Sequence, residues 1–270
     1  MYTVASHAQI LEGSAVSGEI GVSIGAAHYF GDLNPNGNIN RPKTAFGAFF
    51  RKQFGKYIGL KVSGHFAQLG YSDVYSKNEV QKSRNLSFNT NMWELALSGD
   101  FHLYQFFPGQ MGYEFTPYIT LGVGLFTYDP YTYLRGQKYF LRPLHTEGQT
   151  YISGFQPYNP MAMCLPVGIG FKYNIRGNTN IFMELGYRFT TTDYLDDVSR
   201  AYAGSAAFPT LANGDPSPAF LLQDRSYELG TAIGIKGRQR GISKQYDQYA
   251  FAELGISISL FSYKCPTAKY

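Results

Sequence analysis

Three aspartates stand close together in the stretch FMELGYRFTTTDYLDD, residues 182–197. Asp193, Asp196 and Asp197 lie within five positions of one another, a spacing at which carboxylates can bind a hard cation or carry out acid/base chemistry. The residues before them alternate in character, so the same aspartates could instead be the water-exposed end of a β-strand. Which interpretation applies depends on the element that positions them.

The dominant pattern along the chain is an alternation with a period of two. In GEIGVSIGAAHYF, residues 18–30, the apolar Ile20, Val22 and Ile24 fall on one face, and Glu19 falls on the other. The same alternation recurs at about residues 44–54, 57–69, 88–104, 115–128, 163–174, 179–192 and 249–261. Each segment is about as long as a tilted strand needs to be to cross a bilayer.

The connections between these segments alternate in length. Residues 54–57 and 174–178 are tight turns and residues 105–114 form a moderate one, whereas four connections are long. The long connections are residues 31–43, 70–87, 129–162 and 193–248. This asymmetry is typical of a transmembrane β-barrel, with short turns in the periplasm and long loops outside the cell. The sequence therefore predicts an all-β fold, an eight-stranded antiparallel transmembrane β-barrel in the outer membrane of a Gram-negative bacterium.

Composition agrees with strands rather than helices. The chain has 23 Tyr, 21 Phe and 30 Gly, only 16% charged residues and no apolar run long enough for a helical membrane span. A formal charge of +4, with scattered Lys and Arg, gives no support for nucleic-acid binding. Cys164 and Cys265 lack the spacing of a zinc or redox motif. No cofactor, metal or small-molecule substrate is expected.

The barrel prediction divides the chain into three parts. Residues 1–16 form an N-terminal segment in which Ala5 to Ala8 are similar to the small-residue end of a secretory signal, without its basic and apolar regions. Residues 17–262 form the barrel, and residues 263–270 form a periplasmic tail. Pro166 falls inside the sixth segment, which predicts either a bulge there or a strand that begins just after it.

Charged residues on the polar face of the strands should point into the barrel. They form a predicted lumen ionic plug, in which both signs occur at each level: Arg51, Lys61, Glu94, Asp100, Lys172, Glu184, Arg188 and Glu253. Because an unpaired buried charge is costly, compensation inside a narrow barrel is the simplest explanation of the set. The alternative is an intramembrane catalytic or proton-relay cluster around His65, Glu94 and Glu253.

The periplasmic turns and the tail are the predicted partner-binding surface. Phe106 and Phe107 lie beyond the expected strand end in YQFFPGQMGYEF, where apolar surface either binds a protein or belongs to the aromatic girdle at the membrane boundary. The remaining residues of this predicted surface are Met111, Arg176, Lys264 and Cys265. In the last outer loop Lys236, Arg238, Arg240 and Lys244 stand among many carboxylates, which predicts a solvated surface of mixed charge.

Several of these segments resemble one known family. EIGVSIGAAHYFGDLNP, ELALSGDFHLYQFFPG and NIRGNTNIFMELGYRFTTTDYLDDVS, with further segments up to about Pro266, are similar to the PorG-like outer-membrane barrels of the type IX secretion system in Bacteroidetes. The resemblance implies a non-enzymatic subunit that associates with a periplasmic ring of a PorK-like lipoprotein and a PorN-like partner, and supports protein export and, in some species, gliding. It implies contact with outer-membrane lipid or lipopolysaccharide and no catalytic residues.

Two other functions remain open from the sequence. The barrel could act in surface adhesion through its long loops, above all the tyrosine-rich residues 129–162. It could also be a barrel enzyme that uses rim carboxylates such as Asp193 and Asp196 with His145 or His65. In the leading interpretation Asp193, Asp196 and Asp197 stand in water, just beyond the level at which their strand leaves the membrane.

Overall fold

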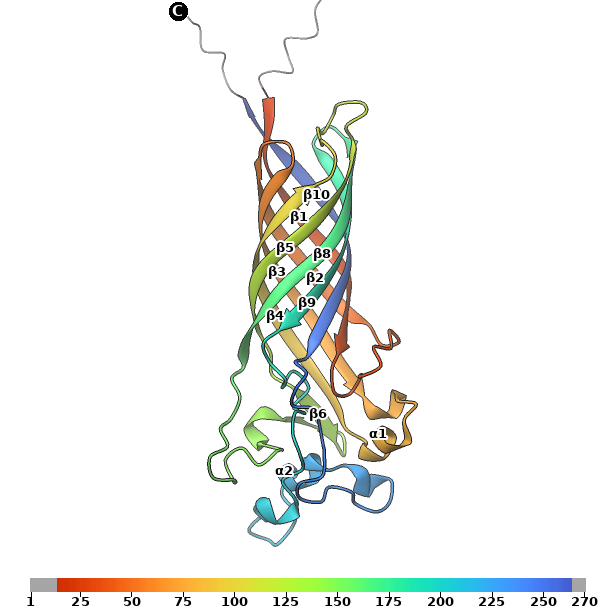
Figure 1. The fold of residues 1–270 in the computed structure, drawn as a ribbon, viewed down its shortest axis with the longest axis vertical. Helices are drawn as coiled ribbons and strands as arrows, with labels where there is room; N and C mark the ends of the chain where they lie inside the picture. The colour runs from red at the N-terminus through yellow and green to blue at the C-terminus, as the bar shows by residue number, and fades with distance from the viewer. Residues whose placement is uncertain (1–13, 264–270) are drawn as a thin grey trace, which may run out of the picture.

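The computed structural model describes residues 14–263 and shows eight long antiparallel strands closed into a barrel (Figure 1). Each of these strands pairs with its neighbours along the chain, and β1 pairs with both β2 and β10, so the sheet closes. The strands are β1 Ser14–Phe30, β2 Lys43–Phe54, β3 Ile58–Ser72, β4 Ser87–His102, β5 Phe115–Thr127, β8 Met161–Arg176, β9 Thr179–Thr190 and β10 Gln248–Tyr263. The predicted eight-stranded antiparallel barrel is confirmed.

Alternation along the strands separates two environments. On β4, Trp93, Leu95 and Leu97 are exposed on the outside, while Met92 and Glu94 are buried inside. The same arrangement on the other strands produces a broad apolar outer belt, which a bilayer would cover. The pairing leaves the barrel without an open edge, as hydrocarbon requires.

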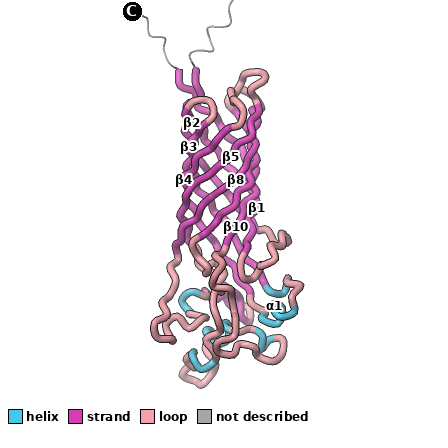
Figure 2. Tube along the Cα trace, viewed as in Figure 1, coloured by secondary structure: helices cyan, strands magenta, loops and turns pink. Residues whose placement is uncertain are grey.

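The two ends of the barrel are unlike one another (Figures 1 and 2). One end has only the short turns. At the other end four loop segments, residues 31–42, 73–86, 128–160 and 191–247, fold together into a structure that we term the cap. It contains the hairpin β6 Tyr131–Leu134 and β7 Gln137–Phe140, and the short helices η2 Asp73–Tyr75, α1 Glu79–Arg84, η3 Arg142–Leu144, η4 Ser205–Ala207, α2 Pro218–Gln223 and η5 Ser226–Glu228. β6 meets the barrel at β4, where Tyr131 pairs with Asn89 and the hydroxyls of Thr132 and Ser87 lie 3.0 Å apart.

Pro166 lies inside a continuous strand, so both predictions made for it are wrong. β8 runs through Pro166, which pairs with Arg188 of β9 without a change of register. On the β5 side the pairing stops at Leu121 with Val167, resumes at Gly124 with Cys164, and keeps its register. Proline has no N–H to donate to β5, and the closed barrel absorbs one gap in the ladder without a bulge.

Glycines on the inner face make room for large side chains of neighbouring strands. A Cβ atom on Gly170 of β8 would lie 2.3 Å from the ring of Tyr118 on β5, and one on Gly255 of β10 would lie 2.3 Å from the ring of Phe182 on β9. These aromatic rings can therefore cross the narrow interior only because the opposing position has no side chain.

The interior continues directly into the cap. Tyr29, Phe88, Phe126 and other aromatic residues near the loop end of the barrel form one buried cluster, which also contains the cap residues Leu33, Leu134, Leu141, Leu195, Val198 and Leu222. Burial of this shared apolar surface is the main force that holds the loops over the barrel mouth.

Candidate functional site

The interior of the barrel near the short turns is filled by a charge-balanced network. Arg51 of β2 is 1% exposed; its Nε lies 2.6 Å from Asp100 Oδ2 and its Nη1 2.7 Å from Glu19 Oε2. Lys172 Nζ lies 2.7 Å from the same Glu19 oxygen. Lys61 Nζ lies 2.7 Å from Glu184 Oε2. Three carboxylates thus face three cationic side chains from six strands.

A second network lies further toward the cap. Arg188 Nη2 is 3.3 Å from Glu94 Oε1, and Tyr249 Oη donates to Glu94 Oε2 at 2.6 Å. His65 lies between two carboxylates, with Nδ1 3.3 Å from Glu94 Oε1 and Nε2 3.4 Å from Glu253 Oε2. This layer balances its charge when both ring nitrogens of His65 carry protons. The groups that suggested a proton relay are therefore close together, but they are buried with the ion pairs.

All eight residues of the predicted ionic plug lie in the interior and take part in these two networks, Glu253 through its contact with His65. The sequence prediction missed Glu19, which binds both Arg51 and Lys172. Glu19 shares the polar face of its strand with Gly21 and Ser23, a signal that could have placed it inside. Its opposite charges come from β2 and β8, so nothing near it in the sequence indicates a pair.

The cap is held together by two buried arginines. Arg84 donates from Nε and Nη2 to the carboxylate of Asp73 at 2.8 and 2.7 Å, and from Nη2 to the Asp32 carbonyl at 3.0 Å. Arg240 donates from Nη1 to Glu147 Oε1 at 3.0 Å and to the Asp197 carbonyl at 2.6 Å. The two arginines also meet, because Arg84 Nη1 donates to the Arg240 carbonyl. Four separate loops are joined in this way.

The prediction that Asp193, Asp196 and Asp197 stand in water is wrong. Asp197 is fully buried and accepts hydrogen bonds from Tyr158 Oη, at 2.7 Å, and from Thr146 Oγ1. Asp193 is 6% exposed and Asp196 is 1% exposed. The strand does end at Thr190, but the following loop turns back over the mouth and takes these carboxylates beneath it.

The predicted solvated surface of the last loop needs the same correction at one position. Arg240 is buried at the centre of the cap, whereas Lys236, Arg238 and Lys244 are exposed.

The residues of the predicted rim enzyme are not brought together. Within residues 14–263, no hydrogen bond or ion pair joins His145 or His65 to Asp193 or Asp196.

Of the predicted apolar side chains at the short-turn end, Met111 is exposed, whereas Phe106 and Phe107 are not fully exposed. Phe106 and Phe107 are half-buried: Lys172 Nζ lies 4.4 Å from the centre of the Phe106 ring, and Phe107 packs edge-on against Tyr113. Met111, in the same turn, is 91% exposed. It lies next to a shallow pocket of about 530 Å³, lined by Tyr57, Leu103, Tyr104, Gln105, Gly112, Tyr113, Glu114, Phe115 and Tyr173.

The other predicted partner-binding residues are divided. Arg176 is exposed at the tight turn between β8 and β9. Lys264 and Cys265 lie outside the described residues. Cys164 is a free, buried thiol on β8.

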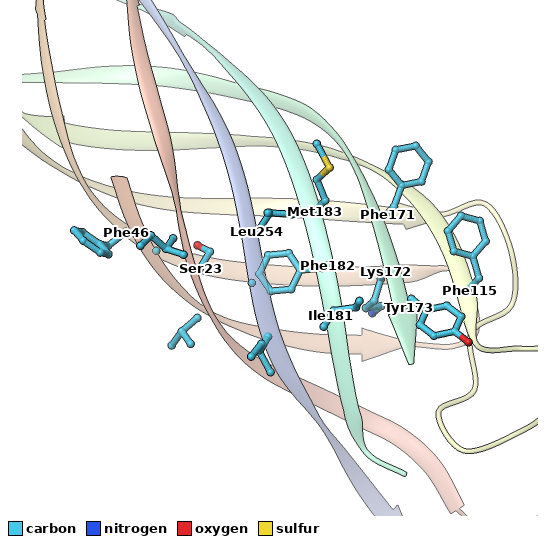
Figure 3. Close-up of a pocket in the computed structure, with 15 residues that line it drawn as sticks. Ser23, Phe46, Phe115, Phe171, Lys172, Tyr173, Ile181, Phe182, Met183 and Leu254 are labelled. Atoms are coloured by element: carbon cyan, nitrogen blue, oxygen red, sulfur yellow. The ribbon is translucent and has the colours of Figure 1, made fainter. Parts of the chain in front are cut away.

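A groove of about 870 Å³ runs along the barrel wall, with lining residues from β1, β2, β5, β8, β9 and β10. Figure 3 shows the residues that line it. Most of its side chains point outward and are apolar, including Phe171, Met183 and Leu254. Since the groove belongs to the outer belt, acyl chains of the bilayer are its expected occupants.

Within residues 14–263, no helix has the length and apolarity needed to cross a membrane. Over the same range, no group of three or more His, Cys, Asp or Glu side chains is arranged to hold a metal ion. The closed barrel, the apolar outer belt and the contrast between short turns and long loops are the features of an outer-membrane β-barrel of a Gram-negative bacterium.

Comparison with protein families gives one match. The model of a family described as a domain of unknown function (DUF6089) matches residues 2–212. No curated protein matches the chain.

Solved structures with a similar fold are outer-membrane proteins of low sequence identity. Neisserial surface protein A has 9% identity and a TM-score of 0.45, with 92% of this chain and 99% of that one covered. Ail, the attachment invasion locus protein of Yersinia pestis, has 13% identity and a TM-score of 0.41, covering 90% and 99%. A major outer membrane protein from Thermus thermophilus has 14% identity and a TM-score of 0.39, covering 90% and 99%. Because these TM-scores are below 0.5, the assignment of a barrel fold rests on the strand pairing of this chain, which closes the sheet.

Proposed function

The chain belongs to the DUF6089 family, and from that premise we propose that it is a non-enzymatic outer-membrane subunit of a type IX protein secretion system. In this role the barrel is a membrane anchor, and its short-turn end binds a periplasmic ring of PorK-like and PorN-like proteins. The partner assignment comes from the sequence resemblance to PorG-like barrels.

One observation carries the anchoring role. The interior is occupied by buried side chains at both ends, by the ion pairs around Arg51 near the short turns and by the apolar cluster beneath the cap. An eight-stranded barrel is in any case just wide enough for its own side chains. A function in binding follows more naturally than a function in conduction.

The partner surface is expected at the turn of residues 105–114. Met111 is almost fully exposed there, beside the pocket between Tyr57 and Tyr113. A large exposed apolar side chain beyond the membrane belt is typical of a protein contact. Phe106 and Phe107 support the turn from within, since Phe106 covers Lys172.

Co-purification from native membranes tests this proposal. Met111→Asp should lower the amount of ring proteins recovered with the barrel at least tenfold, because a charge replaces an apolar contact. Ile39→Asp is the matched control, since Ile39 is an exposed apolar residue at the opposite end. Equal recovery of ring proteins with the wild type and both variants would place the contact elsewhere.

Adhesion through the cap is the second candidate. Tyr133 and Phe140 of the β6–β7 hairpin and Tyr151 of the same loop are exposed. Deletion of residues 131–140 should abolish surface binding and leave secretion intact if adhesion is the function. This shorter deletion is preferable to removal of residues 129–162, because it spares the hydrogen bonds of Glu147 to Arg240 and of Tyr158 to Asp197.

A further inference from the structure

Four aspartates lie together beneath the cap, and we term them the aspartate cluster: Asp32, Asp193, Asp196 and Asp247. They are between 0% and 7% exposed. They come from the first loop and from both ends of the last one. None of them forms an ion pair with a Lys, Arg or His side chain within the described residues. Arg84 and Arg240 pair instead with Asp73, Glu147 and Asp197.

The hydroxyl of Tyr29 connects two members of the cluster. Tyr29 Oη lies 2.5 Å from Asp196 Oδ2 and 3.0 Å from Asp247 Oδ1. A phenol has one proton and can donate to only one of these oxygens. The second contact is a hydrogen bond only when a carboxyl proton is donated back to Tyr29. The geometry therefore favours the acid form of Asp196 or Asp247.

Asp193 provides a separate observation. Asp32 and Asp247 accept backbone hydrogen bonds from Ile242 and Leu195, and Asp196 accepts one from Val198. Both side-chain oxygens of Asp193 lack a hydrogen-bond partner within the described residues, although the residue is only 6% exposed. An ionised carboxylate in this position has no ion-pair partner within the described residues. The nearby Ser199 and Arg200 favour the charged form less than burial disfavours it, so the neutral acid is preferred.

The surrounding groups do not neutralise the cluster. Arg84 from α1, Arg240 and Arg200 from the last loop favour ionisation, whereas Glu147 from the third loop opposes it. Burial raises the pKa of Asp193 to about 7 and that of Asp32 to about 6. Burial and the neighbouring carboxylates raise the pKa of Asp196 and that of Asp247 well above the usual range.

We propose that the aspartate cluster is a proton-controlled latch that closes the cap over the barrel mouth. With protons bound, the cluster joins the first loop to both ends of the last loop. When the protons are lost, mutual repulsion and the cost of buried charge separate these loops. The fold of the barrel wall does not change with pH, because the four aspartates that lose protons all lie in the loops.

The direction of the pH dependence follows from proton linkage. A closed cap binds more protons than an open one, in which the aspartates titrate near their ordinary pKa of about 4. The closed state is therefore most stable at low pH, and its stability falls as the pH rises from about 4 through the raised pKa of about 7 at Asp193.

Distances between spin labels on the first and last loops test the latch. Labels at Asn36→Cys and Ser205→Cys, both exposed positions, are introduced into a chain carrying Cys164→Ser and Cys265→Ser, in vesicles with EDTA. The distance distribution should be narrow at pH 5 and become broad and longer by pH 8.5. Asp193→Asn combined with Asp247→Asn should keep it narrow at both pH values, since the amides retain the shape without the charge.

Asp215→Asn serves as the matched control, because Asp215 is exposed in the same loop and should leave the transition unchanged. Asp193→Asn alone should move the midpoint of the transition to higher pH, which keeps the test decisive if the double variant fails to fold. A wild-type distribution that stays narrow from pH 5 to 8.5 would overturn the proposal. So would an identical transition in the single or double variant.

Discussion

At the scale of single residues, buried charges are the most unusual feature of the molecule. Arg51 spans between Glu19 and Asp100 deep inside the barrel, and His65 stands between Glu94 and Glu253. Such pairs add little net stability relative to an apolar core, but each member is needed once the others are present. Their effect is to make the interior specific and dense.

Removal of one member should therefore be costly. Arg51→Met leaves Glu19 and Asp100 without their shared partner and should lower the free energy of unfolding by about 3–5 kcal/mol. Urea unfolding in lipid vesicles, followed by the gel mobility of folded and unfolded forms, measures this difference. Arg176→Met, at an exposed position, should change the value by less than about 0.5 kcal/mol.

A compensated variant separates charge from packing. Addition of Asp100→Asn to Arg51→Met removes the stranded charge, because Glu19 keeps Lys172 and Glu184 keeps Lys61, and should recover more than half of the lost stability. A single Arg51→Met variant as stable as the wild type would contradict the assigned role of this network.

At the scale of elements, the strands were predictable and the loops were not. Alternation located all eight barrel strands, because a strand between lipid and a filled interior has a different residue requirement on each face. The cap left no comparable signal. Asp32 accepts from the backbone of Ile242, and Arg84 donates to the carbonyl of Arg240, so the environment of each depends on a distant segment. Aspartates are usually exposed, which made Asp193 look solvated.

The close packing of β5 against β8 gives an element-scale prediction. Gly170→Val should destabilise the barrel by about 1–3 kcal/mol, because the new side chain occupies the space of the Tyr118 ring. Gly99→Val is the control, since a Cβ at Gly99 would have only an ordinary contact at 3.9 Å from the Leu121 carbonyl. The same urea titration applies, and equal loss in the two variants would show that the contact with Tyr118 is unimportant.

At the scale of the whole molecule, one barrel carries two different ends. The cap closes the loop end, and the turn around Met111 presents apolar surface at the other. The networks that fill the interior keep these ends separate. The proposed role in secretion places the ring at the short-turn end, and the proposed latch acts at the opposite end, so each can fail without the other.

Site-directed labelling of whole cells tests this two-ended arrangement most directly. In a Cys164→Ser and Cys265→Ser background, Lys56→Cys marks the short-turn end and Asn213→Cys marks the cap; both positions are exposed. A membrane-impermeant maleimide should label Asn213→Cys on intact cells, and Lys56→Cys only after the outer membrane is permeabilised. Labelling of Lys56→Cys on intact cells, with Asn213→Cys protected, would contradict the account.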